Sequence, residues 1–65
     1  MKQQVINAMI RKNNQIPNGP TYWHWNTLEK KCGQWQALRR IGNMNCEVPL
    51  GRTLKEALRS VQIGA

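Results

Sequence analysis

The spacing of hydrophobic residues predicts a helix near the beginning of the sequence. Val5, Ile6, Met9 and Ile10 fall on one arc of a helical wheel, so residues 2–14 are expected to form an amphipathic helix. The segment that follows contains two prolines around Asn18-Gly19, a pair typical of turns. We therefore expect a loop over residues 15–21.

A second helix is predicted over residues 53–63. Thr53 and Glu56 have the T-x-x-E spacing of a capping box, in which the two side chains satisfy free backbone N–H groups of the first turn. An apolar stripe follows the box at helical period, formed by Leu54, Ala57, Leu58 and Val61.

The segment between them, residues 22–42, also shows a helical spacing. Leu28, Cys32 and Trp35 stand at i, i+4 and i+7, but one continuous helix would put Arg39 inside that apolar stripe, where an unpaired charge is costly. A break at Gly33 removes the conflict. We therefore predict two short helices, at about 26–32 and 34–41, in a helix-turn-helix arrangement; a single helix whose Arg39 side chain extends outward is the alternative.

Residues 42–52 lack a helical pattern. Gly42-Asn43 and Leu50-Gly51 favour turns, and Pro49 would restrict any strand here to the edge of a sheet. The segment is expected to be irregular or to form a short β-hairpin, a wing, around residues 43–51. The predicted fold is mainly α: one compact domain over residues 1–65, with three or four helices and a helix-turn-helix-like core.

The charge balance indicates the class of partner. The chain has ten Lys and Arg residues against three Glu and no Asp, which gives a formal net charge of +7 over 65 residues. Such an excess in one small domain is typical of proteins that bind polyanions. Nucleic acid is therefore the predicted partner, with DNA favoured over RNA.

Catalysis and metal binding are not expected. His24 is the single histidine, and no carboxylate near it in sequence would orient it as a base for Cys32. His24, Cys32 and Cys46 supply three of the four ligands that a structural zinc ion needs. We predict a protein that is not an enzyme, has no cofactor and no metal, does not enter a membrane, and is reduced and cytoplasmic.

The predicted helix over 34–41 supplies candidate contacts to DNA. Arg, Gln and Asn side chains make paired hydrogen bonds to guanine and adenine in the major groove. The candidates for base contact are Gln36, Arg39, Arg40 and Asn43. Basic side chains on neighbouring segments are the candidates for phosphate contact: Lys30, Lys31, Arg52, Lys55 and Arg59. This layout is similar in outline to small winged-helix and helix-turn-helix regulators of mobile elements, which implies a regulatory or accessory role and makes a homodimer plausible.

A different class of function remains open. The aromatic run that contains Tyr22, Trp23 and Trp25 would serve as an anchor for a partner protein if one of the indole rings is exposed. The alternative is therefore a small inhibitor or adaptor that binds an acidic protein. The same aromatic residues would stack on unpaired bases in a protein that binds RNA or single-stranded DNA.

Overall fold

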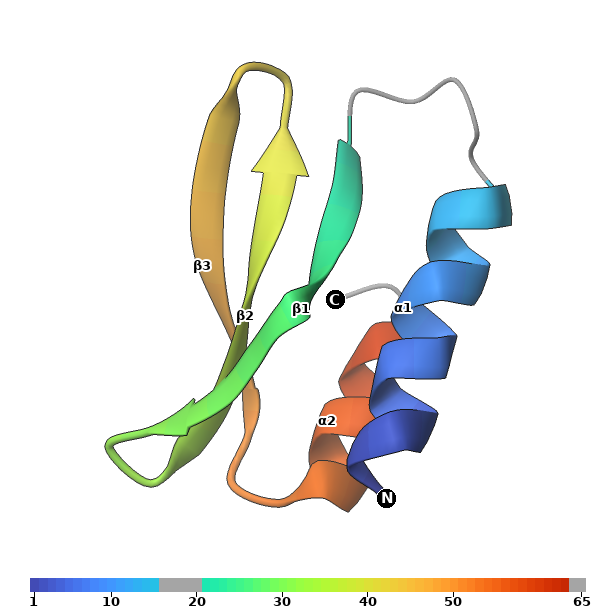
Figure 1. Ribbon diagram of the computed structural model, residues 1–65. Helices are drawn as coiled ribbons and strands as arrows, with labels where there is room; N and C mark the ends of the chain where they lie inside the picture. Colours follow the sequence, from blue (N-terminus) through green and yellow to red (C-terminus); the bar gives the residue numbers. More distant parts are fainter. Residues whose placement is uncertain (16–20, 64–65) are drawn as a thin grey trace.

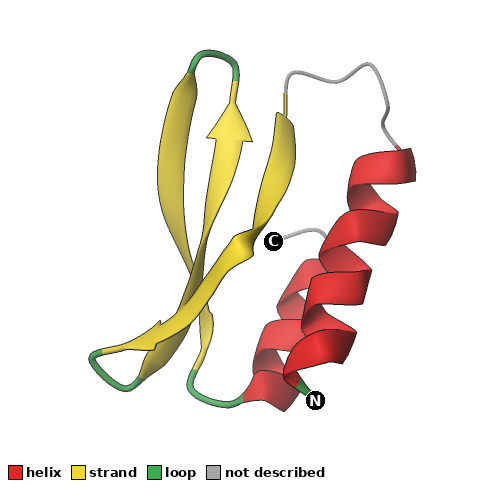
Figure 2. Ribbon diagram, in the orientation of Figure 1, coloured by secondary structure: helices red, strands yellow, loops and turns green. Residues whose placement is uncertain are grey.

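The described part of the chain forms two helices and a three-stranded sheet. The computed structural model describes residues 1–15 and 21–63, so the predicted turn at Asn18-Gly19 lies outside the described residues. The elements follow in the order α1 (Lys2–Gln15), β1 (Thr21–Lys31), β2 (Gln34–Ile41), β3 (Met44–Gly51) and α2 (Leu54–Gln62) (Figure 1). The strands form an antiparallel sheet in the order β1-β2-β3, and both helices pack on one of its faces (Figure 2). We call that face the helix side; no described element covers the opposite, open face.

The prediction of a mainly α fold is wrong. The predicted helices at 26–32 and 34–41 are β-strand apart from the residue at the turn, and residues 34–41 form the central strand. There is consequently no helix-turn-helix and no recognition helix over this segment. Cys32-Gly33 is the tight turn of the β1–β2 hairpin, with φ values of 51° and 79° at its two residues. Positive φ at both positions is the pattern of a type I′ turn, whose twist matches that of paired strands.

Both terminal helices are confirmed. α1 and α2 agree with the predicted spans to within one residue at each end. The hydroxyl of Thr53 accepts a hydrogen bond from the backbone N–H of Glu56 at 3.1 Å, as the capping box requires. The return half of the box is shifted by one residue, because the Glu56 carboxylate accepts from the N–H of Arg52 at 2.9 Å.

The segment predicted as a wing is instead a strand of the three-stranded sheet. Residues 44–51 form one strand, β3, whose partner is β2, so the turn of this hairpin lies at Gly42-Asn43 and no separate hairpin occurs within 43–51. β3 is an edge strand, as Pro49 required.

The hydrophobic core lies between the sheet and the helices. It takes Trp23 and Leu28 from β1, Ala37 from β2 and Leu50 from β3, and the helices contribute Val5, Ala8, Met9, Ala57 and Val61. Along β2, Trp35, Ala37 and Arg39 point to the helices, whereas Gln36, Leu38 and Arg40 point to the open face.

One polar side chain fixes α1 against the sheet. The side-chain amide of Asn13 makes two hydrogen bonds to the backbone of Trp23 on the outer edge of β1. Its Oδ1 accepts from the Trp23 N–H at 2.7 Å, and its Nδ2 donates to the Trp23 carbonyl at 3.0 Å. The amide therefore takes the place that a further strand would occupy at this residue.

The connection from β3 to α2 depends on a glycine. Gly51 has a φ of 142°, a conformation that side chains rarely adopt, and a Cβ at this position would lie 2.6 Å from Cβ of Glu56. Both the backbone and the packing of α2 therefore exclude a larger residue. Gly42 also has a positive φ, of 63°, but it has open space around it.

Replacing Asn13 with alanine is expected to destabilise the fold by about 1–3 kcal/mol, because the partly buried N–H and C=O of Trp23 lose their partners. The matched control is Asn14→Ala, which makes the same change at an exposed position in the same helical turn. Urea unfolding followed by Trp fluorescence measures both variants. Equal stability of the two variants would contradict the role given to Asn13.

Gly51→Ala is expected to cost about 2–4 kcal/mol, since it adds a steric overlap with Glu56 to the strain of the backbone. Gly42→Ala bears backbone strain alone and should cost about 1 kcal/mol. Thermal unfolding of the two variants side by side tests this order. A smaller loss for Gly51→Ala than for Gly42→Ala would refute it.

Candidate nucleic-acid interface

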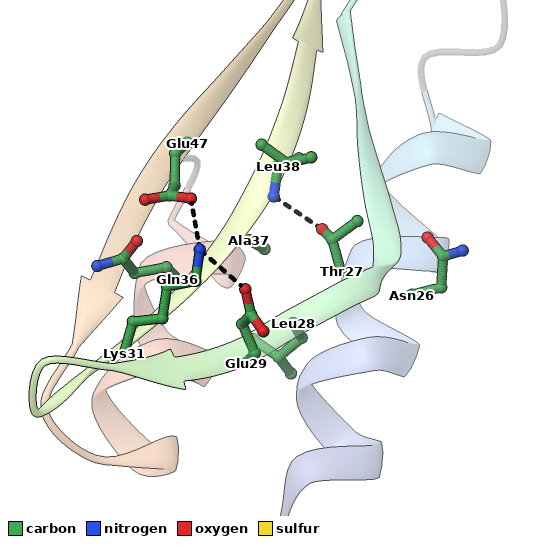
Figure 3. A pocket seen from close by; sticks show the side chains of 9 residues that line it. All are labelled: Asn26, Thr27, Leu28, Glu29, Lys31, Gln36, Ala37, Leu38 and Glu47. Carbon is green, nitrogen blue, oxygen red and sulfur yellow. Dashed lines mark hydrogen bonds and ion pairs between the residues drawn. The ribbon is translucent and has the colours of Figure 1, made fainter.

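A wide bulge in β1 shapes the open face. His24 pairs with Leu38 and Glu29 pairs with Gln36, so four residues of β1 stand opposite the single residue Ala37. The hydroxyl of Thr27 bridges this interruption: it accepts from the N–H of Leu38 at 2.8 Å and donates to the carbonyl of His24 at 2.6 Å. The bulge leaves a shallow hollow on the open face, beside Thr27 and Leu38 (Figure 3).

The charged groups in this hollow pair with one another. The ammonium of Lys31 lies 3.2 Å from the carboxylate of Glu29 and 3.4 Å from that of Glu47, and Figure 3 shows it between the two. The hydrogen bond to Glu29, which has the larger effect, and the hydrogen bond to Glu47 raise the pKa of Lys31 above its ordinary value of 10.5. Lys31 is therefore engaged by carboxylates of the chain itself, which argues against its predicted role in phosphate contact.

The four residues predicted to contact bases do not share one surface. Gln36 and Arg40 lie on the open face, and Nε of Arg40 donates to the carbonyl of Gly42 at 2.8 Å. Arg39 lies on the helix side, where its guanidinium stands 5.2 Å from the ring centre of Trp23. Asn43 is in the exposed turn between β2 and β3. Their predicted grouping depended on a helix over 34–41, and a strand separates them by alternation.

The predicted phosphate contacts divide in a similar way. Arg52 and Lys55 lie around the first turn of α2, and Arg59 is one turn further along the same exposed helix face. Lys30 is on the helix side of β1, because it pairs with Trp35, which packs against the core. Four of the five predicted residues thus lie on the helix side, and Lys31 does not.

The aromatic residues proposed as a protein interface are also separated. Trp23 is 5% exposed and belongs to the core. Tyr22 is 42% exposed on the open face, where its ring meets that of His24 edge to face at 5.1 Å. Trp25 is 46% exposed at the start of the bulge. Up to the bulge these residues alternate, with Tyr22 and His24 on the open face and Trp23 on the helix side.

Sequence reasoning missed two basic residues on the helix side. Nζ of Lys2 lies 5.9 Å from the ring centre of Trp35. Arg11 lines a shallow groove between the helices, together with Gln4, Asn7, Ala8, Leu58 and Gln62. The sequence signal that could have identified Arg11 is the helical period of residues 2–14, which places it opposite the apolar arc.

The structure separates the charges of the molecule by side. Among the described residues, the basic side chains on the open face are those of Lys31 and Arg40, and Glu29 and Glu47 lie there too, so the side chains of this face have a formal net charge of zero. The other eight basic residues and Glu56 belong to the helix side or to the loop that leads into α2: Lys2, Arg11, Lys12, Lys30, Arg39, Arg52, Lys55 and Arg59. Eight positive charges and one negative charge account for the whole net charge of +7.

The described residues offer little for other chemistry. No three His, Cys, Asp or Glu side chains within residues 1–15 and 21–63 come close enough to hold a metal ion. Cys32 and Cys46 are free thiols. Neither of the two described helices has the length and apolar character needed to cross a membrane.

Comparisons of the chain with protein-family models, with curated protein sequences and with solved structures gave no significant match.

The Thr27 hydroxyl can be tested by near-isosteric replacement. Thr27→Val keeps the shape but removes both hydrogen bonds, and it should destabilise the protein by about 1–3 kcal/mol because the N–H of Leu38 loses its partner. Thr27→Ser keeps the hydroxyl and should recover most of that loss. Urea unfolding measures the difference, and hydrogen exchange at the Leu38 amide should be faster in the valine variant. Unchanged exchange at this amide would contradict the bridging role.

Proposed function

We propose that this protein binds nucleic acid, double-stranded DNA first, in a regulatory or accessory role. The observation that carries the proposal is which groups the three glutamate carboxylates pair with. Glu29 and Glu47 both pair with Lys31, and Glu56 accepts from the backbone at the start of α2. None of them forms a salt bridge with a basic side chain of the helix side among the described residues.

Four cations of the helix side are therefore available to an external partner. Lys2, Arg11, Lys55 and Arg59 form no ion pair with any described residue. Cations held on a folded surface release counterions when they meet the closely spaced phosphates of a duplex, and this release supplies most of the affinity of sequence-independent binding.

The place of the aromatic rings favours a duplex over a single strand. Proteins that bind single strands combine a positive groove with exposed rings on which bases stack. Here the exposed ring of Tyr22 lies on the neutral face, and Trp35, on the positive side, is partly buried with the Lys2 ammonium near its ring. Neither of these two rings is both well exposed and on the positive side, and a duplex requires the charge alone.

A second candidate function is favoured by the exposure of Tyr22 and Trp25. Aromatic side chains of this size anchor protein interfaces when a partner buries them. A module of this kind would bind an acidic protein through its apolar anchors, and salt would affect it less than it affects a DNA complex.

The proposal predicts a steep dependence on salt. Binding to a fluorescein-labelled duplex of about 20 base pairs, followed by anisotropy, should give a log–log slope of affinity against salt between about −3 and −5. Affinity should then fall by about 10²- to 10³-fold between about 50 and 200 mM salt. A slope near zero, or no binding at about 20 mM salt, would refute nucleic-acid binding and favour the protein partner.

A further inference from the structure

We infer, on the basis of the proposed function, that the helix-side surface contacts the phosphates of the duplex and that the open face of the sheet points away from it. We define this helix-side surface by six basic residues: Lys2, Arg11, Lys30, Arg52, Lys55 and Arg59. The inference assigns a surface and a mode of binding, sequence-independent phosphate contact, in place of a base-reading element.

The surface begins at one end of the sheet, around Trp35. Lys30 pairs with Trp35 from β1, and Gly51 pairs with it from β3, directly before Arg52. The Lys2 ammonium lies 5.9 Å from the same ring. Three cations, one from α1, one from β1 and one from the loop after β3, thus stand at chain positions paired with, next to or in contact with Trp35. Both helices also begin at this end (Figure 1), and their N-termini add positive potential there.

From this end the surface continues along the helices. Lys55 and Arg59 are separated by about 6 Å along the axis of α2, close to the rise of two base pairs. Leu58 and Gln62 lie beside them and also line the groove that contains Arg11, so the surface reaches α1 without interruption. Lys2 and Arg11 are about 14 Å apart along α1, which corresponds to about four base pairs.

The neutral residues of this surface suit phosphate oxygens. Gln4 and Asn7 of α1 and Gln62 of α2 line the groove with Arg11, and their amides are able to donate hydrogen bonds without adding charge. The carboxylate on this side, Glu56, accepts a hydrogen bond from the N–H of Arg52.

The width of the helix pair limits it to phosphates. A single helix with its side chains is about 10–12 Å across, which is as much as the major groove admits. α1 and α2 pack side by side, so together they are about 20 Å wide and cannot enter the groove as a pair. The surface therefore spans the phosphate ridges, and its contacts carry no sequence information.

The open face is the competing surface, and its charges disfavour it. A three-stranded sheet is about 10 Å wide and is narrow enough for the major groove. Its net charge is zero, however, and it would bring Glu29 and Glu47 toward phosphates while Lys31 is already engaged by both. The electrostatic attraction of this face for a duplex is correspondingly small.

Matched arginine variants separate the two surfaces. Arg59→Gln and Arg11→Gln remove one charge from the helix-side surface, and Arg40→Gln makes the same change on the open face. All three lower the net charge equally, so a difference between them reports contact rather than overall charge. Anisotropy titrations across salt on two unrelated duplexes, and on an RNA duplex of equal length, give the affinity and the slope. Urea unfolding confirms that each variant is folded.

Each helix-side variant is expected to weaken binding by about eightfold at about 0.1 M salt and to reduce the slope by about one, equally on both sequences. Arg40→Gln should change affinity less than twofold and leave the slope unchanged. The opposite ranking, or losses that differ between the two sequences, would overturn the inference and leave nucleic-acid binding standing. No binding by the wild-type chain would instead refute the proposed function. Tighter binding to the RNA duplex, with the same ranking of variants, would overturn the assignment to DNA.

Discussion

Outside their bulges, the strands of this protein present alternate side chains to the two helices and to the open face, and this two-residue period determines the place of most polar groups in the sheet. Trp35, Ala37 and Arg39 face the helices, whereas Gln36, Leu38 and Arg40 face away from them. Because the helices supply the apolar surface on one side only, the core is thin. The remaining strand positions are free to hold charge, amides and rings, and the separation of charge by side follows from this constraint.

The two helices were predictable from sequence because each is defined by a local sequence pattern. The arc that contains Val5 and Met9 defines α1, and the Thr53–Glu56 box defines the start of α2. The sheet was not predictable in the same way. Leu28, Cys32 and Trp35 match a helical period by coincidence, since Cys32 is part of the hairpin turn that separates Leu28 from Trp35. The turn places a cysteine in the left-handed conformation, where glycine or asparagine would have indicated it.

The positions of the candidate site residues were predictable from the sequence only in part. Composition alone indicated a polyanion as partner, and Lys55 and Arg59 needed only the period of α2 to be placed on one exposed face. The grouping of Gln36 with Arg39 and Arg40 required a helix that does not form. The ion pair between Lys31 and Glu47 joins residues sixteen positions apart. It depends on the pairing of the strands, which no local sequence pattern specifies.

The two edges of the sheet differ in how readily they could pair with a further strand. At β1 the side-chain amide of Asn13 already occupies the N–H and C=O of Trp23, so an incoming strand would have to displace it. At β3, Pro49 has no N–H to offer, and the Ser60 hydroxyl donates to the carbonyl of Leu50. Polymerisation through sheets needs two receptive edges on every molecule. Strand addition at either edge would therefore meet an obstacle at these residues, which disfavours the joining of many copies through their sheets.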